Sequence, residues 1–486
     1  MALFKRKSSD KDPSPALKPA AVVTGLGPIT SVGIGRNDFY QSLLEGRSGF
    51  GPITLCDASR SACKIAGEVK DFSMSDYVEN GRLIERWAPR PVQLALAAAV
   101  MALHDAELTI EGIHPDRFAL VVGTGVGNLG STVEHLGRWK QGKDLPATAA
   151  FTNIHHSAAC VLSSFLDIKG VATTLSTGCN SGIDGLGQAL RLIQADAADA
   201  VLVVGVDCEV VPEIIGALEA SGSLTTKFNE DPARASRPFD LNRDGNVLGE
   251  GACGILIESE ASALQRKARI YARVAGYHMA SAGGGRRYSH DSPDLNPEPC
   301  IRAIRGAIRD AKWSPDQVDL VNANGSASVL YDALEARAIA EVMPGGTVPV
   351  HSIKSMLGQH GAGSSALQCA VACLTLRREI APPTINHDTL DPACEGIQVL
   401  TRPLISHFER VLVHSIGLGG FYYSSAAFEQ GDWDEELNVT GMGHVAWSEA
   451  HNPKHLPAPE FQEPIKPWSG ASSFHPEGPD RMSPPS

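Results

Sequence analysis

Four predicted strands, three of which run into a loop containing glycine or small polar residues, constrain the fold most strongly. They cover residues 117–123, 200–207, 348–353 and 410–417. The second reads Ala-Val-Leu-Val-Val-Gly-Val before its terminal Asp207, with no polar side chain in between. Such a run is typical of a strand that is buried on both faces, between two layers of helices.

Predicted helices alternate with these strands in both halves of the chain. Residues 91–107 place alanine and leucine at helical spacing, residues 182–194 are amphipathic, and residues 365–376 are rich in small side chains. The alternation predicts an α/β fold with mainly parallel sheets. In such sheets functional sites form in the loops at the strand ends, so these loops carry the functional prediction.

The chain divides into four predicted segments. Residues 1–19 are basic and polar and predict a mobile tail, residues 20–268 and 269–428 form two halves of similar outline, and residues 429–486 form a proline-rich extension. The extension lacks periodicity, which is typical of an extended or disordered segment. Alternatively it wraps around the fold or a partner, with Trp433, Trp447 and Trp468 as anchors.

Residues 174–185 predict a reactive cysteine. They read Thr-Leu-Ser-Thr-Gly-Cys-Asn-Ser-Gly-Ile-Asp-Gly, which places Cys179 on a turn of small residues before an amphipathic segment. At a helix N-terminus the unpaired N–H groups and the helix dipole favour a negative charge, so we expect a lowered thiol pKa. A buried structural cysteine is the alternative, but small polar and glycine neighbours are unusual for a packed core.

A second glycine-rich stretch contains a G-x-G-x-x-G pattern at Gly125, Gly127 and Gly130. A dinucleotide site requires a helix at this pattern and then a strand that ends in an acidic residue about 20 positions on. Residues 138–144 are instead a polar run without a strand. We therefore expect a tight loop packed near a site rather than a nucleotide-binding loop.

Charge and composition exclude several classes of function. The 486 residues include 42 Lys and Arg against 55 Asp and Glu, a net charge of −13, which argues against nonspecific nucleic-acid binding. The ten cysteines show no zinc-binding spacing, so no metal site is expected. No apolar run approaches the roughly 18 residues of a membrane span. Without a secretory signal, the cysteines are expected to be reduced and the protein cytoplasmic.

Residues 237–251 are dense in charge and glycine and lead into a predicted strand at residues 252–257. Paired charges beside an apolar strand predict a structured loop with buried ion pairs.

From residue 20 to about residue 428 the chain resembles the β-ketoacyl-acyl carrier protein synthases, the elongating condensing enzymes of fatty acid and polyketide synthesis. The resemblance rests on six motifs in the family's order and spacing. They are Val-Val-Thr-Gly-Leu-Gly27, Leu43-Leu-Glu-Gly-Arg-Ser-Gly49, Arg237-Pro-Phe-Asp to Gly-Glu-Gly251, Lys354-Ser-Met-Leu-Gly358, Pro382-Pro-Thr-Ile-Asn386 and Gly417-Leu-Gly-Gly420. The resemblance implies the thiolase-like five-layered α/β/α/β/α fold of two similar halves, paired as a dimer.

The resemblance also implies roles for individual residues. Cys179 matches the family's acyl-accepting cysteine, and the turn at Leu418 and Gly419 matches its oxyanion and gate position, where Leu418 replaces the usual Phe. Lys354 and Glu335 match a structural ion pair near the site. Further matches implied by the resemblance are Asp332 as a supporting residue and Ser326 and Ser328 as pantetheine-binding residues.

The chain departs from the family at its two histidines, which polarise the malonyl thioester. Asn324 stands at the first position and Gln359 at the second, although one inserted residue would align His360 instead. Asparagine and glutamine donate hydrogen bonds to a thioester oxygen. Unlike histidine, they carry no proton that titrates near pH 7.

Three functional interpretations follow. The chain is a condensing enzyme with a histidine-modified site, a transacylase that loads Cys179 without elongation, or a non-catalytic partner of an active synthase, as chain-length factors are. Such factors usually lack the cysteine, which this chain retains. For all three, the resemblance implies an acyl carrier protein as partner and pairing with an identical or second synthase. It implies no permanently bound cofactor, because phosphopantetheine arrives as the carrier's thioester.

Overall fold

A computed structural model describes residues 18–108, 113–283, 296–343, 345–431 and 433. The first half of the chain supplies β1 (Ala21–Thr30), β2 (Gly33–Ile34), α1 (Arg36–Leu44), β3 (Phe50–Pro52), β4 (Ile65–Gly67), α2 (Gly81–Trp87), α3 (Arg90–Asp105), β5 (Phe118–Gly123), α4 (Leu129–Lys140), α5 (Ala149–Thr152), α6 (Ser157–Phe165), β6 (Ala172–Leu175), α7 (Ser181–Gln194), β7 (Ala200–Cys208), α8 (Pro212–Ala220), β8 (Leu248–Ser259) and α9 (Glu260–Gln265). The second half supplies β9 (Ala272–Ser281), α10 (Glu298–Asp310), β10 (Leu320–Asn322), α11 (Val329–Val342), β11 (Pro349–His351), α12 (Lys354–Leu357), α13 (Gly361–Arg378), β12 (Ile380–Ala381), β13 (Gln398–Val399), β14 (Leu404–Ile405), β15 (Arg410–Ile416) and β16 (Tyr422–Glu429).

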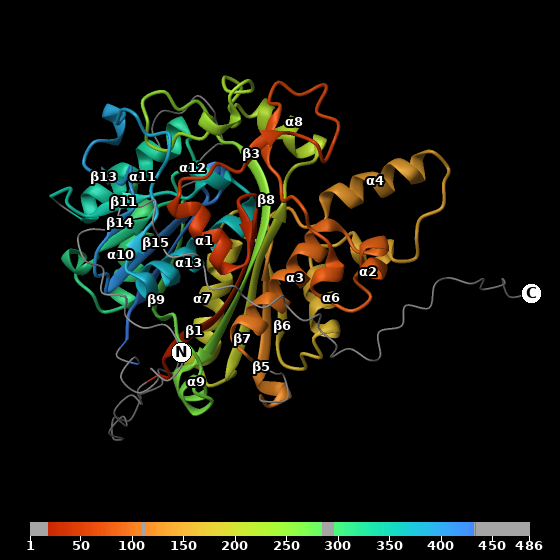
Figure 1. Cartoon of the computed structure of the whole chain (residues 1–486), viewed down its shortest axis with the longest axis horizontal. Coiled ribbons are helices and arrows are strands. Elements are labelled where there is room, and N and C mark those ends of the chain that lie inside the picture. The colour runs from red at the N-terminus through yellow and green to blue at the C-terminus, as the bar shows by residue number, and fades with distance from the viewer. Residues whose placement is uncertain (1–17, 109–112, 284–295, 344, 432, 434–486) are drawn as a thin grey trace, which may run out of the picture.

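The main strands form one hydrogen-bonded sheet, in the order β13-β11-β10-β15-β16-β9-β1-β8-β7-β5-β6. The two halves of the chain meet at β1 and β9, which pair over a short antiparallel stretch beginning at Val22 and Arg273. The strands of each half therefore stay together on one side of this junction. Figure 1 shows the first-half strands in the middle of the molecule and the second-half strands to their left.

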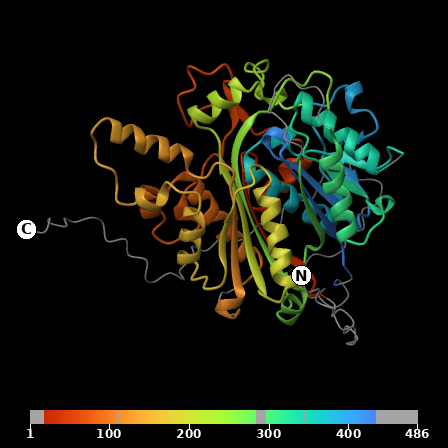
Figure 2. The ribbon, with the colours of Figure 1, turned by 180° about the vertical axis from the view of Figure 1, so that it is seen from behind.

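Helices cover both faces of these strands, because successive side chains of a strand point to opposite faces. In β5, Phe118, Leu120 and Val122 pack on the outer helices α3 and α6, whereas Ala119 and Val121 face the central helices α7 and α13. A third cluster joins β10, β15 and β16 to α10 and α11 on the far side. Viewed from behind, α7 lies in yellow against the central strands (Figure 2).

The predicted strands and helices are present, but the sheet is mixed rather than mainly parallel. β5 pairs parallel with β6 and β7, and β10 pairs parallel with β11 and β15. The central pairs β7–β8, β1–β8, β15–β16 and β16–β9 are antiparallel. Two helical layers bury both faces of a strand whatever its neighbour's direction, so burial alone did not determine the direction.

Residues 237–251 form the structured loop that their charges predict. Arg237 and Asp240 make a buried ion pair at 3.0 Å, and Arg243 binds Asp391 at 2.6 Å. At the end of the segment, Glu250 is fully buried and pairs with Arg90 at 2.6 Å.

At the end of the described chain, Trp433 packs where the two halves of the fold meet. Its Nε1 donates to Glu260 at 2.9 Å, and the Arg273 guanidinium lies 5.4 Å from its ring centroid. Trp447, Trp468 and nearly all of the predicted N-terminal tail lie outside the described residues. Among the helices that are described, none has the length and apolar character needed to cross a membrane.

Candidate active site

Cys179 lies on the turn between β6 and α7, two residues before the first residue of the helix. Gly178 has φ 66°, a left-handed conformation that glycine adopts without steric cost. Ser181 closes the turn by donating to the Gly178 carbonyl at 2.7 Å and accepting from the Thr177 N–H at 2.8 Å. The Cys179 carbonyl accepts a 2.8 Å hydrogen bond from Ser365 of α13, so the turn is held on both sides.

The sequence predicts a lowered pKa for the Cys179 thiol, and this prediction is wrong. Burial, followed by the charge of Glu209, raises the pKa of Cys179 to about 12, although hydrogen bonds from the Leu418 N–H and the Gln359 side chain oppose the rise. Cys179 is only 9% exposed, so loss of solvation outweighs the helix dipole. The free protein therefore holds Cys179 as a thiol at neutral pH.

The structure brings Gln359, and not His360, to the sulfur. Gln359 is positioned by its backbone, which donates to the Val247 carbonyl at 2.8 Å and accepts from the Gly249 N–H at 2.9 Å. The His360 ring turns towards β8 instead: a Cβ placed on Gly251 would lie 3.1 Å from its Nε2. Neither ring nitrogen of His360 has a hydrogen-bond partner among the described residues. Burial lowers the pKa of His360 to about 3, so the ring is neutral.

Asn324 presents its NH₂ group to the site because its oxygen is already engaged. Its Oδ1 accepts from Lys354 Nζ at 3.1 Å and from the Ile416 N–H at 3.2 Å. Lys354 also binds the Asn324 carbonyl at 2.8 Å and Gln368 Oε1 at 3.0 Å. One buried ammonium group thus holds both the backbone and the side chain of Asn324.

Lys354 and Glu335 do not form the expected direct ion pair. Each of them instead binds the loop that contains Asn324. Glu335 accepts from the Asn324 N–H at 2.7 Å and the Gly325 N–H at 2.8 Å, on the opposite side of the loop from Lys354. Burial raises the pKa of Glu335 and lowers that of Lys354, and each charge offsets part of the other's shift. Asp332 supports the same loop by accepting from the Ser326 N–H at 3.0 Å.

The remaining predicted residues lie around this centre. Ser326 is buried on the Asn324 loop, and Ser328 caps α11 by accepting from the Tyr331 N–H at 3.3 Å. Leu418 and Gly419 form a short 3₁₀ turn after β15, in which Gly419 has φ 81°. The Leu418 side chain is exposed while its N–H faces the sulfur, an arrangement that suits a gate above an anion-stabilising donor.

Two carboxyl groups beside the nucleophile were missed from the sequence. Asp207 ends the apolar run of β7 and accepts from the Gly125 N–H at 2.8 Å and the Ala362 N–H at 2.7 Å. The G-x-G-x-x-G segment is therefore a tight loop packed at the site, as expected. Glu209 lies two residues further along. Acidic residues directly after a buried strand are the signal that could have identified both.

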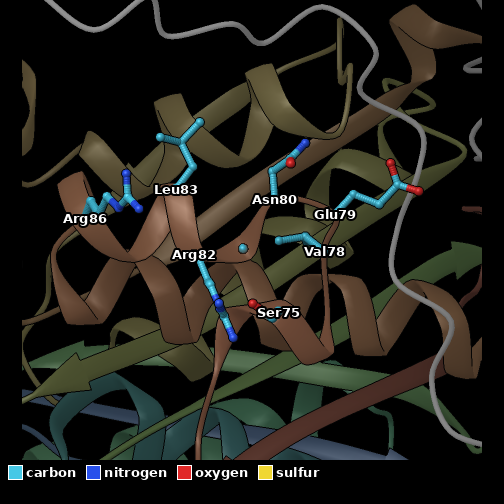
Figure 3. Close-up of a pocket in the computed structure, with 8 residues that line it drawn as sticks. Ser75, Val78, Glu79, Asn80, Arg82, Leu83 and Arg86 are labelled. Carbon is cyan, nitrogen blue, oxygen red and sulfur yellow. The ribbon is translucent and has the colours of Figure 1, made fainter.

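A surface hollow lies elsewhere on the molecule. Its volume is about 390 Å³, and Figure 3 shows Arg82 and Arg86 of α2 among its lining residues, together with Ser75, Val78, Glu79, Asn80 and Leu83. None of the predicted site residues lines it.

The chain matches the models of two protein-family domains. Residues 19–263 match the beta-ketoacyl synthase N-terminal domain, and residues 271–388 match the beta-ketoacyl synthase C-terminal domain. The chain belongs to the β-ketoacyl synthase family. Membership agrees with two features of the structure. Cys179 lies on a turn before a helix, and the strands of both halves form one sheet.

Relatives of this β-ketoacyl synthase come from both fatty acid and polyketide synthesis. The 3-oxoacyl-[acyl-carrier-protein] synthase 2 of Synechocystis sp. is 33% identical over 408 residues, which cover 83% of this chain and 96% of the relative. The tetracenomycin polyketide synthase ketoacyl synthase alpha subunit of Streptomyces glaucescens is 32% identical over 413 residues, which cover 82% and 95%.

Solved ketosynthase structures share the fold. The ishigamide ketosynthase/chain length factor is 30% identical, with a TM-score of 0.77. The match covers 85% of this chain and 100% of that chain. A type II polyketide acyl carrier protein in complex with its ketosynthase contains a chain that is 28% identical, with the same TM-score and coverage. The fold is therefore thiolase-like.

Proposed function

We propose that this β-ketoacyl synthase takes an acyl group onto Cys179 from a carrier-protein thioester. It then condenses that group with malonyl-carrier protein, using amides where the family uses imidazoles. The convergence of the Leu418 N–H and the Gln359 side chain on the Cys179 sulfur carries the proposal. The relatives named as 3-oxoacyl-carrier-protein synthases support the same reaction class.

In the loading step, the Cys179 sulfur attacks the carbonyl carbon of the thioester. The Sγ–carbon bond forms, the carbon–sulfur bond to the carrier breaks, and the thiol proton ends on the released phosphopantetheine sulfur. The carbonyl oxygen carries negative charge between these events. The N–H groups of Cys179 and Leu418 are the proposed donors to that oxygen.

In the condensation step, loss of carbon dioxide from the malonyl group builds negative charge on an enolate oxygen. The Asn324 NH₂ group is the donor that Lys354 leaves available, and Gln359 is the second. Neutral amides stabilise the charge by hydrogen bonding but provide no titrating proton. Loss of one optimal donor commonly costs about 10²–10³ in rate, so we expect condensation slower than in a synthase with two histidines.

The solved structures of relatives also suggest which proteins this chain binds. Solved relatives include a ketosynthase bound to its acyl carrier protein and a ketosynthase paired with a chain length factor. We extend both to this chain: an acyl carrier protein delivers the thioester, and a second synthase, identical or different, pairs with it. If condensation is absent, the transacylase interpretation remains, because loading requires only Cys179 and the oxyanion donors.

Intact-protein mass spectrometry after incubation with octanoyl-carrier protein tests the proposal. We expect one octanoyl adduct on the parent and on Cys160→Ala, a control at an exposed cysteine, and none on Cys179→Ala. Acylation of Cys179→Ala to the parent's level, or no acylation of a folded parent, would contradict the assignment of Cys179 as the acyl acceptor.

A further inference from the structure

Glu209 is a buried carboxyl group without a partner. It follows the end of β7 and is 7% exposed, yet its side chain makes no hydrogen bond or ion pair with another described residue. Asp207, two residues earlier, accepts hydrogen bonds from Thr124, Gly125, Val126 and Ala362. The fold therefore satisfies one of the two neighbouring carboxyl groups, whereas the oxygens of the other keep some contact with solvent and stay open to a ligand.

The Glu209 carboxyl group lies against the start of α13. A Cβ placed on Gly361 would lie 2.8 Å from Glu209 Oε1, so glycine at this position leaves room for the carboxyl group. Gly361 has φ 50°, which glycine also favours. The charge of Glu209 affects Cys179 more strongly than that of Asp207. Glu209 therefore lies beside Gly361, two residues after Gln359 in the chain, and its charge acts on the Cys179 thiol.

A purely structural role does not account for this placement. A buried polar group that stays unpaired lowers stability, and most buried polar groups in folded proteins therefore have partners. The exceptions are expected where a ligand supplies the missing partner. Sites built to hydrogen-bond a substrate group reject analogues that lack it, because the protein's own polar group is then left unpaired.

We infer that Glu209 determines acyl specificity: its carboxyl group hydrogen-bonds an oxygen substituent, keto or hydroxyl, of the acyl chain loaded on Cys179. The site consequently prefers oxygenated acyl thioesters to saturated ones of equal length. This inference rests on the proposed function of Cys179 as acyl acceptor. Glu209 takes no part in the bond changes of loading, which are those given above.

The protonation state of Glu209 favours an oxygen substituent over an amine. Burial, followed by the charge of Asp207, holds the pKa of Glu209 well above its ordinary value, which favours the protonated form of the carboxyl group. A neutral carboxyl group offers one O–H donor and one carbonyl acceptor. A keto oxygen accepts from this donor, and a hydroxyl group uses either function.

Competition between two carrier-protein thioesters tests the inference. The full-length protein receives equal amounts of octanoyl- and 3-hydroxyoctanoyl-carrier protein, and intact-protein mass spectrometry measures the initial ratio of the two Cys179 adducts. We expect the parent to favour the hydroxylated chain by at least about tenfold. In Glu209→Ala the ratio falls to near one because the saturated chain loads faster. Glu209→Gln, which keeps a donor and an acceptor, retains most of the preference.

The exposed Glu213 of α8 supplies a control: Glu213→Ala also removes a nearby acidic group and is expected to leave the ratio unchanged. A parent ratio of one, or an equal ratio in the parent and Glu209→Ala, overturns the inference and leaves Cys179 as the acyl acceptor. Failure of the parent to load either chain contradicts the proposed function and overturns both. Thermal melting of each variant confirms that it is folded, and Glu209→Gln provides the isosteric comparison.

Discussion

Lys354 determines which atom of Asn324 faces the reaction. By binding Oδ1 and the backbone carbonyl of Asn324, the ammonium group leaves the NH₂ group as the side chain's available donor. Asparagine in this loop is therefore oriented as a donor, the function that a protonated imidazole nitrogen would provide. Glu335 holds the other side of the same loop through two N–H groups. Under the proposed function, polarisation of the substrate by Asn324 would depend on two buried charges, those of Lys354 and Glu335.

The raised pKa of Cys179, about 12, predicts how its alkylation depends on pH. Below the pKa, the thiolate fraction and hence the alkylation rate rise about tenfold per pH unit. We expect the rate with iodoacetamide to climb throughout pH 7–10 without a plateau. Peptide mapping identifies the modified residue, and Cys179→Ala corrects for the other cysteines. A plateau below pH 8 would mean that the thiol pKa is lowered.

At the residue scale, the sequence indicates the nucleophile but not its protonation state. The small residues around Cys179 are local and visible in the sequence. The rise in its pKa comes from burial and from Glu209, thirty positions away, and these arise only when α7, β7 and α13 pack together. Likewise, Gln359 and His360 are adjacent in sequence. The backbone pairing of Gln359 with Val247 and Gly249 decides which side chain reaches the sulfur.

At the scale of elements, the site depends on close contact between α7, which begins just after Cys179, and α13. The two helices approach so closely at Gly182 that an added Cβ would lie 2.3 Å from the Ala362 carbonyl oxygen. A Cβ added to Gly205 of β7 would lie 2.6 Å from the same carbonyl oxygen. Three elements therefore converge where backbone packs directly on backbone.

We expect Gly182→Ala to separate α7 from α13, because a carbonyl oxygen of a helix backbone cannot move aside as a side chain can. Overpacking of this kind costs about 1–3 kcal/mol in the free energy of unfolding. Cys179 acylation should slow together with it, since the nucleophile's turn is displaced. Urea denaturation and the loading assay measure the two effects.

Gly216 of α8 provides the control, because an added Cβ there meets nothing within 4 Å. Gly216→Ala is expected to stabilise the fold by about 0.5–1 kcal/mol through helix propensity alone. Equal stability of Gly182→Ala and the parent would show that the contact between the two helices is loose.

The sequence predicted most elements but not their directions. The helices at residues 91–107, 182–194 and 365–376 correspond to α3, α7 and α13, since local periodicity suffices to locate them. β7 and β8 were indistinguishable from parallel strands because both are buried on two faces. The two strands pair antiparallel, and the long segment between Cys208 and Leu248 would have allowed either direction.

At the scale of the whole molecule, β6 forms one edge of the sheet, and among the described strands its one partner is β5. An unpaired edge is a template for another strand. Val171, just before β6, is 44% exposed, and Trp139 of α4 is 66% exposed on the same half of the chain. In Figure 1, α4 projects outward on this side of the molecule. The resemblance implies pairing with a second synthase, and we expect its interface to join the edge strands of residues 160–174.

Sedimentation tests this pairing. One chain has a mass of 51.4 kDa, and we expect the parent at micromolar concentration to sediment at about twice that mass. Val171→Asp should shift it towards one chain, because a charge near the edge loses solvation and meets its own copy in a two-fold pair. Ile405→Asp, at an exposed apolar residue of β14, is the control and should remain paired. A parent that sediments as one chain would contradict the homodimer.

The central claim is that the side-chain amides of Asn324 and Gln359 donate hydrogen bonds to the enolate oxygen in place of two imidazoles. Condensation is slower as a result. Carbon dioxide release from malonyl-carrier protein, measured on octanoyl-loaded enzyme in a single turnover, tests it most directly. We predict slow release by the parent and release about 10²-fold faster by the double variant Asn324→His with Gln359→His. His360→Ala should match the parent, since its ring faces β8. Rapid release by the parent that His360→Ala abolishes would contradict the claim and assign the second histidine's role to His360.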